Sequence, residues 1–302
     1  MDATAEELIA RLRRDPEDFE AFRLLGEHYR RLGDHASLAN LLEGWAKRSQ
    51  DGAKAARAYH ESALLVMELG DLPRAESLLL RSLERDATFA DADAQLVALL
   101  EHRGDTTALL QHLTDRAAQL NELGDRAGLA AVEEHIGRTY EHRLGRPDRA
   151  IAHYRKAFEA DPSLVPAIYA AREIYREAGN LKAAIPLYQM EANAEPDITR
   201  RVGLLRELAT IRREHAHDLP GAISSLQEAL RIAPDEATVI HELASLRLEQ
   251  AAVGGPDAPA ERAEAADLLF QLAQLLGGEH GLAYAGAALD AAPDFEPALD
   301  YL

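Results

Sequence analysis

The sequence predicts an all-α fold, a right-handed α-solenoid of helix-turn-helix hairpins. Two observations support this prediction. Ala and Leu are abundant, aromatic residues make up 5% of the chain and β-branched residues are sparse, so few segments favour strands. In addition, turn residues recur along the 302 residues at a regular distance, with an apolar helical stretch on each side, as in repeat proteins.

The first recurring feature is a glycine followed by Asp or Asn, which predicts the tight turn inside each hairpin. A glycine readily adopts the left-handed conformation that ends a helix, and the Asp or Asn side chain accepts hydrogen bonds from the free amides that open the next helix. Gly70 and Gly104 are 34 residues apart. The pairs are Gly33-Asp34, Gly70-Asp71, Gly104-Asp105 and Gly179-Asn180.

The second recurring feature is a proline between consecutive hairpins, at Pro162, Pro196, Pro234 and Pro293. Proline disfavours helix at the preceding residue but fits the first turn of the next helix. Pro162 and Pro196 are again 34 residues apart. We therefore expect first helices of the hairpins near residues 18–31, 53–68, 89–103, 126–143, 164–178, 199–215 and 236–250, and second helices near residues 35–49, 73–85, 106–122, 147–159, 181–193 and 219–231.

The two ends depart from this pattern. Residues 1–15 are expected to form a capping helix, because Thr4 and Glu7 have the spacing of a capping box. Glycines and prolines predict a flexible loop over residues 251–260. Residues 261–302 are expected to form degenerate helical repeats, with helices near 260–276 and 280–291, that end within a repeat, as in a piece of a longer protein. The sequence leaves open whether the helix near 280–291 is the first or the second of its hairpin.

Small and large residues also repeat in register within the hairpins. Ala150, Tyr154 and Ala157 precede Pro162 at the same distances as equivalent residues precede Pro234. This pattern resembles the tetratricopeptide repeat, a 34-residue helical hairpin, over residues 16–250, with degenerate repeats at both ends. The residues that carry the resemblance are Leu25, Gly26, Tyr29, Ile136, Gly137, Ala150, Tyr154, Ala157, Pro162, Tyr175, Ala184, Tyr188, Pro196, Ala222, Leu226, Ala229 and Pro234.

The resemblance implies that the first helices line a concave surface that binds a peptide or partner protein. The candidate partner-binding residues on it are Arg23, Arg57, Arg138, Tyr169, Arg176, Arg206, Arg213 and His241. Because arginine forks suit carboxylates, we hypothesise that the partner segment is acidic or is a C-terminus. The alternative is that nearby acids neutralise the arginines on a solvated face: Glu134, Glu173, Glu207 and Glu214.

Composition and motifs weigh against catalysis and against other partners. The chain has no Cys, which excludes disulfides and thiolate chemistry and fits a reducing, cytoplasmic location. The net charge of -19 disfavours nucleic acid and anionic membrane surfaces, and no apolar run predicts membrane insertion. His241-Glu242 begins like a zinc-protease motif, but Ser245 stands where the second His is needed. We expect no cofactor, no metal and no enzymatic activity.

The sequence therefore predicts a non-enzymatic scaffold for protein–protein interaction. One alternative is a regulatory or targeting module of a larger protein whose other domains lie beyond residue 302. Self-association through the terminal repeats is a further alternative. The identity of the partner and its pathway do not follow from the sequence, because the same repeat architecture serves many processes.

Overall fold

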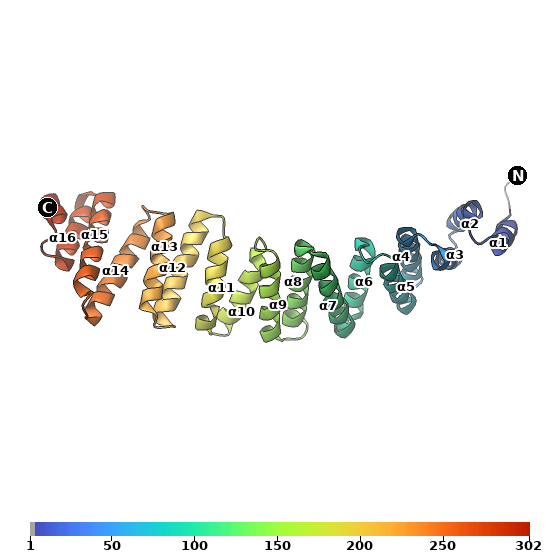
Figure 1. Ribbon diagram of the computed structural model, residues 1–302, viewed down its shortest axis with the longest axis horizontal. Helices are drawn as coiled ribbons and strands as arrows, with labels where there is room; N and C mark the ends of the chain where they lie inside the picture. The colour runs from blue at the N-terminus through green and yellow to red at the C-terminus, as the bar shows by residue number, and fades with distance from the viewer. Residues whose placement is uncertain (1–3) are drawn as a thin grey trace. The chain divides into compact units, whose positions relative to one another are not determined.

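The computed structural model describes residues 4–302, and these residues form seventeen α-helices and no β-strand (Figure 1). The predicted all-α class is confirmed, and the predicted helices agree with the observed ones to within a few residues at their ends. The helices are α1 (Ala5–Arg14), α2 (Phe19–Leu32), α3 (His35–Arg48), α4 (Gly52–Glu68), α5 (Leu72–Arg85), α6 (Ala90–Arg103), α7 (Thr106–Leu123), α8 (Arg126–His142), α9 (Pro147–Ala160), α10 (Val165–Glu177), α11 (Leu181–Ala194), α12 (Ile198–Glu214), α13 (Leu219–Ile232), α14 (Ala237–Val253), α15 (Ala258–Leu276), α16 (Gly278–Ala291) and α17 (Glu296–Tyr301).

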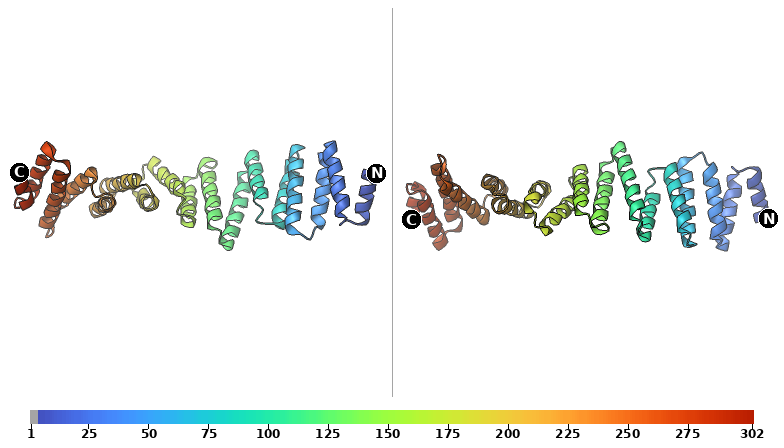
Figure 2. Two further views of the ribbon diagram at one scale, coloured as in Figure 1. Left: turned by 90° about the horizontal axis from the view of Figure 1, so that it is seen from above. Right: turned by 90° about the horizontal axis from the view of Figure 1, so that it is seen from below.

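The chain divides into two compact units, which are described separately. The first unit ends at Thr114 and the second spans Asp115–Leu302, so the boundary falls inside α7. In the first unit, from α1 to α6, each helix packs against its neighbours in the sequence, and the same holds from α8 to α17 in the second unit (Figures 1 and 2). This is the packing expected of stacked helical hairpins. Within residues 4–302, no helix is both long and apolar enough to cross a membrane.

The turns inside the hairpins form as the sequence predicts. Gly33 and Gly104 end α2 and α6 with a left-handed backbone, and φ is 68° at both. The Asp34 carboxylate then accepts a hydrogen bond of 3.0 Å from the backbone amide of Ser37. Each turn therefore reverses the chain in a single step, because the glycine ends one helix and the aspartate caps the next.

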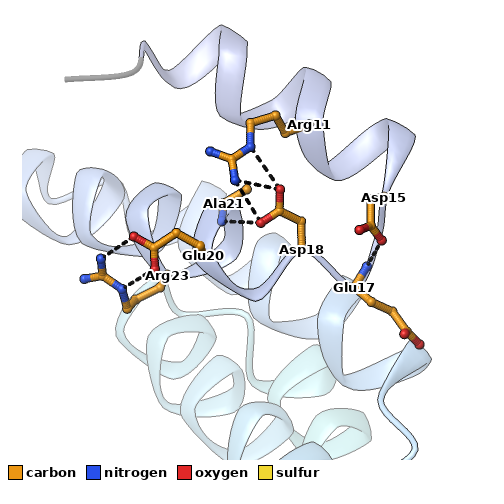
Figure 3. A network of polar contacts seen from close by, with 7 residues as sticks. All are labelled: Arg11, Asp15, Glu17, Asp18, Glu20, Ala21 and Arg23. Atoms are coloured by element: carbon orange, nitrogen blue, oxygen red, sulfur yellow. Dashed lines mark hydrogen bonds and ion pairs between the residues drawn. The ribbon is translucent and has the colours of Figure 1, made fainter. Parts of the chain in front are cut away.

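Helix α1 is held on the first hairpin by apolar packing and by an ion pair. The predicted capping box at Thr4 forms with Glu7. Leu8 of α1 is buried in the cluster that also contains Leu25 of α2. Arg11 donates two hydrogen bonds, of 2.9 and 3.0 Å, to the carboxylate of Asp18, which is the N-cap residue of α2 (Figure 3).

Small residues allow close approach of the two helices of a hairpin in the second unit. A Cβ atom added to Gly137 of α8 would lie 2.8 Å from ring carbons of Tyr154 in α9 and 3.3 Å from the carbonyl oxygen of Ala150. Ala150 and Ala157 of α9 are fully buried. The Gly and Ala positions of the repeat therefore lie where helix backbones meet, and a larger side chain there would force the helices apart.

The loop before α15 is shorter than the sequence predicts. A flexible loop is expected over residues 251–260, but α14 continues to Val253 and α15 begins at Ala258. Ala251 is 3% exposed, so packing of its methyl group favours one more turn of α14. Pro259 lies in the first turn of α15, where a proline is compatible with helix.

The buried residues of α16 have the spacing of the second helix of a hairpin. Gly281, Ala285 and Ala288 are buried, and they precede Pro293 at the spacing with which the second-helix residues of α13 precede Pro234. Helix α15 packs against both α14 and α16. Helix α14, which follows the second helix α13, has the place of a first helix, so α15 packs between a helix with first-helix placement and one with second-helix spacing.

Candidate functional site

Three of the predicted partner-binding residues line one pocket in the second unit. The pocket has a volume of about 270 Å³ and lies between α12 and α14, the first helices of their hairpins. It is therefore on the face that the repeat pattern assigns to partner binding. The lining residues are Arg206, Ala209, Thr210, Arg213, Leu226, His241, Glu242, Ser245 and Leu246.

Helical periodicity explains why these side chains meet. On α12, Arg206, Thr210 and Arg213 are spaced i, i+4 and i+7, which brings them to one face of the helix. His241 and Ser245 are spaced i and i+4 on α14 and face the same pocket. The pocket therefore has an arginine near each end of its α12 wall and a hydroxyl group at the middle of that wall.

Two ion pairs link α12 to α14 along the pocket. The Arg206 guanidinium donates hydrogen bonds of 2.9 and 2.5 Å to the carboxylate of Glu242. The Nε atom of Arg213 lies 2.9 Å from Oε2 of Glu249. The hydrogen bonds with Glu242 raise the pKa of Arg206, so this guanidinium stays charged. A spacing of seven residues on both helices separates the two pairs by about 10 Å, because an α-helix rises 1.5 Å per residue.

The carboxylates that pair with Arg206 and Arg213 are not the ones that the sequence suggests as neutralising partners. Glu242 and Glu249 belong to the next first helix, whereas Glu207 and Glu214 are on α12 itself. The Arg206 and Glu242 side chains are 37% and 39% exposed. Exposed pairs of this kind contribute about 0–1 kcal/mol each.

An aromatic ring from the following hairpin contacts His241. The ring centroids of His241 and Tyr284 of α16 are 5.9 Å apart with an interplanar angle of 73°. The Tyr284 hydroxyl lies 3.5 Å from Nδ1 of His241. Residues of α12, α13 and α14 therefore line the pocket, and Tyr284 of α16 contacts one of them, His241.

The remaining candidates in the second unit are outside this pocket. Tyr169 of α10 is 47% exposed. Arg176 is paired on the same helix, with its Nε atom donating a hydrogen bond of 2.6 Å to Glu173. Arg138 of α8 is exposed and makes no hydrogen bond or ion pair with any residue of the described chain, 4–302.

The two candidates in the first unit differ in their charge partners. Arg23 of α2 contacts two carboxylates of its own helix, Glu20 at 2.7 Å and Glu27 at 2.6 Å. Figure 3 shows the contact with Glu20. Arg57 of α4 is exposed, and within residues 4–302 it has no hydrogen bond or ion pair. Among the predicted arginines of the described chain, Arg57 and Arg138 thus make no ion pair, although the charge of Arg57 contributes to lowering the pKa of Asp86.

A buried arginine that sequence reasoning missed lies beside Tyr169. Arg172 is 6% exposed, and its guanidinium carbon lies 5.0 Å from the centroid of the Tyr169 ring and 4.3 Å from that of Tyr188. Its Nε atom is 2.7 Å from a carboxylate oxygen of Glu191, which is 2% exposed. Burial raises the pKa of Glu191 against the opposing effect of Arg172.

A signal for Arg172 was present in the sequence. It lies three residues before Tyr175, as Gly137 lies three residues before Tyr140, so an arginine stands where the hairpin α8–α9 has Gly137. A charged residue at a position that requires close helix packing indicates a buried, paired charge. Among residues 4–302, no group of three or more His, Asp or Glu side chains is arranged to hold a metal ion.

Comparison with known proteins supports the repeat identity. Residues 134–164 match the family model described as Tetratricopeptide repeat. No curated protein matches the chain. The predicted resemblance is thereby confirmed, and the matched stretch contains Gly137, Ala150 and Tyr154, on which it was based.

Several solved structures are similar to this chain at low sequence identity. MamA from Desulfovibrio magneticus RS-1 is 16% identical, with 58% of this chain and 93% of that chain covered and a TM-score of 0.36. PilF of Pseudomonas aeruginosa is 17% identical, with 71% and 91% covered and a TM-score of 0.36. YrrB, described as a TPR protein with an unusual peptide-binding site, is 19% identical, with 61% and 96% covered and a TM-score of 0.29.

Proposed function

We propose that this chain is a protein-binding scaffold whose second unit holds an extended acidic segment of a partner protein across α12 and α14. The observation that carries the proposal is the pocket of about 270 Å³ at which Arg206, Arg213 and His241 meet. Its arginines are accessible, its internal ion pairs are exposed, and it lies on the first-helix face of the repeat. Extended segments are commonly bound on such faces in helical repeat proteins.

The hydroxyl groups in the pocket are suited to accept hydrogen bonds from a peptide backbone. Thr210 donates its hydroxyl proton to the carbonyl oxygen of Arg206, at 3.1 Å, and Ser245 donates to that of His241, at 2.9 Å. With their protons used in this way, both hydroxyl oxygens keep free lone pairs. Backbone N–H groups of a bound segment can donate to these oxygens while its acidic side chains reach Arg206 and Arg213.

The distance between the arginines limits the spacing of the acidic residues. Arg206 and Arg213 are about 10 Å apart along α12, given the rise of 1.5 Å per residue. A polyproline II segment has three residues per turn and advances about 9 Å per turn, so residues i and i+3 share one face at the matching distance. We therefore expect the bound segment to carry acidic residues three positions apart in a polyproline II conformation.

Fluorescence anisotropy with a labelled, proline-rich peptide that carries Glu at i and i+3 tests the proposal. Arg206→Ala and Arg213→Ala should each weaken binding about tenfold, because a charge-assisted hydrogen bond contributes about 1.5–3 kcal/mol. The matched control is Arg155→Ala, which removes an exposed arginine of α9 that lies 4.0 Å from Glu159. Equal affinities for Arg206→Ala and Arg155→Ala would reject this site.

A further inference from the structure

A second, larger groove lies on a different side of α14. Its volume is about 560 Å³, within the range of about 300–1,000 Å³ typical of binding pockets. The floor is made by Leu243 and Arg247 of α14. Leu243 follows His241 by two residues, and Arg247 follows Ser245 by two residues. His241 and Ser245 face the first pocket. Two residues correspond to a rotation of about 200° around a helix of 3.6 residues per turn. The two cavities therefore open on nearly opposite sides of α14.

Two helix faces form the walls of this groove. On α13 the wall residues are Gln227, Leu230 and Arg231, and Pro234 follows the helix end. They have the spacing i, i+3, i+4 and i+7, which describes one face over about two turns. Both α13 and α15 are connected to α14 by short turns, so they run in the same direction on either side of it.

The wall on α15 has the same periodicity with acidic residues at its edge. Glu264, Asp267, Leu268 and Gln271 are spaced i, i+3, i+4 and i+7. The Gln271 side-chain amide donates a hydrogen bond of 3.0 Å to the carbonyl oxygen of Pro234, which joins the two walls at one end. The result is a groove about two helical turns long that is bridged at this end.

Half-buried and buried leucines line the middle of the groove, and the arginine of its floor is paired with carboxylates of the protein. Leu230 and Leu268 are half-buried, and Leu243 is buried below them. Arg247 is 12% exposed and is held by Glu261 and Glu264, each at 2.7 Å. The positive charge of Arg247 on the floor is therefore neutralised by carboxylates of the protein itself.

The two edges have uncompensated charges of opposite sign. Asp267 on the α15 edge and Arg231 on the α13 edge are both exposed, and neither makes a hydrogen bond or an ion pair within residues 4–302. A ligand that lies in the groove thus meets apolar surface in the middle, a carboxylate on one side and a guanidinium on the other. This arrangement distinguishes one orientation of a charged ligand from the reverse orientation.

We propose that this groove binds an amphipathic helix of a partner protein. Large apolar residues of that helix, at spacing i, i+4 and i+7, would contact Leu230, Leu243 and Leu268. Lys or Arg on one flank would lie beside Asp267, and Asp or Glu on the other flank beside Arg231. The proposed surface is separate from the pocket that carries Arg206, so the chain would hold two segments of its partners at once.

A designed peptide with this pattern serves as the probe. It is a fluorescein-labelled helical peptide of about 16 residues, long enough for measurable helicity, with Leu at the three apolar positions, Lys along one flank and Glu along the other. A second peptide has the Lys and Glu positions exchanged. Anisotropy titrations compare both peptides on the intact protein and on a charge-exchanged variant, Asp267→Lys with Arg231→Glu.

The expected result is a reciprocal exchange of preference. The intact protein should bind the first peptide about tenfold more tightly than the second, and the charge-exchanged variant should prefer the second by a similar factor, which corresponds to about 1.4 kcal/mol each way. Leu268→Gln, a change at a half-buried position, should weaken both peptides on either background. The control Asp290→Lys, at an exposed residue of α16, should leave the preference of the intact protein unchanged.

Two results would overturn the groove proposal. The first is absence of binding of both peptides to the intact protein. The second is an equal preference of the intact and charge-exchanged proteins. Arg206→Ala should leave this binding unaltered, so a failure here is distinguishable from a failure of the acidic-segment site on α12 and α14.

Discussion

The guanidinium of Arg172 packs on the ring of Tyr188 at 4.3 Å, where the preceding hairpin has Gly137 packed against Tyr154. Tyr154 and Tyr188 are 34 residues apart, so they occupy the same position of the repeat. One hairpin therefore uses direct contact between a backbone and an aromatic ring, and the next uses a charged side chain between two rings. The second solution requires a carboxylate, Glu191, to compensate the buried charge.

We predict that Glu191→Ala destabilises the second unit by about 1.5–3 kcal/mol, because the buried Arg172 loses its nearest carboxylate and keeps only the more distant Glu173 and Glu207, at 3.5 and 3.6 Å. The double variant Arg172→Leu with Glu191→Leu should recover most of this loss, since an apolar pair carries no desolvation cost. Both effects are measured by urea unfolding, with hydrogen exchange of the backbone amides of α10 and α11 as the readout. Glu159→Ala, at an exposed residue of α9, is the control. A double variant less stable than Glu191→Ala would contradict the prediction.

The contact between Gly137 and Tyr154 predicts opposite effects for two Gly→Ala substitutions. In Gly137→Ala the new methyl group would lie 2.8 Å from the Tyr154 ring, and overpacking of this kind costs about 1–3 kcal/mol. Gly203 lies in α12 with no atom within 4 Å of an added Cβ atom, so Gly203→Ala should stabilise the protein by about 0.5–1 kcal/mol. Thermal unfolding of the two variants should move in opposite directions, and a stabilised Gly137→Ala would show that the ring gives way freely.

A half-buried histidine, His60 of α4, predicts a pH effect on the first unit. Burial lowers the pKa of His60 against weaker opposing effects of Asp91 and Glu61, and its ring lies 5.2 Å from that of Phe89. The unfolded state has the ordinary histidine pKa of about 6.5, so below this pH it binds a proton that the folded state resists. The stability contribution is therefore present above about pH 6.5 and is lost as the pH falls towards the folded-state pKa.

The measurement is the urea concentration at which the first unit is half unfolded, compared at pH 7.5 and at pH 5.5. Hydrogen exchange of the backbone amides of α4 is the readout. His60→Leu should reduce the difference between the two pH values, because it removes the group whose pKa changes on folding. His102→Leu, at an exposed residue of α6, should keep the difference seen in the unmodified protein. Equal pH dependence in His60→Leu and His102→Leu would exclude His60 as the cause.

Local signals explain why the helices were predictable and why some contacts were not. The turns are determined by adjacent residues, such as Gly33 and Asp34, so the helix boundaries follow from short stretches of sequence. The meeting of Arg206 with His241 also follows from the repeat period. The pairing of Arg206 with Glu242, 36 residues away, depends on how closely α12 and α14 approach, which no local pattern specifies.

Two further contacts have the same origin. Trp45 of α3 is half-buried and stacks on Phe22 of α2 at 5.2 Å, a contact between helices that no local pattern specifies. The repeat position of Arg172 indicates a buried charge, but its place between the rings of Tyr169 and Tyr188 depends on how α10 packs against α11. In both residues the outcome depends on the packing between helices, which periodicity alone does not describe.

The ion pair between Arg206 and Glu242 predicts a variant that binds the acidic segment more tightly. Glu242 holds the guanidinium with hydrogen bonds of 2.9 and 2.5 Å, so it competes with any carboxylate of a partner for the same donors. Glu242→Gln removes this competing charge and leaves a side chain of similar size. Because an exposed pair contributes about 0–1 kcal/mol, affinity for the Glu-i, i+3 peptide should rise by up to about fivefold.

Anisotropy titrations at low and at physiological salt separate this effect from a general change in charge. The control Glu214→Gln removes the same charge from α12, and Glu214 does not line the pocket. A long-range charge effect would strengthen binding to both variants and would be reduced by salt screening. If binding is stronger because the Arg206 guanidinium no longer pairs with a carboxylate at position 242, the gain should occur only in Glu242→Gln. This gain should be absent when Arg206→Ala is introduced into the same chain. A gain that persists without Arg206 would assign the effect to another cation of the face and would remove Arg206 from the site.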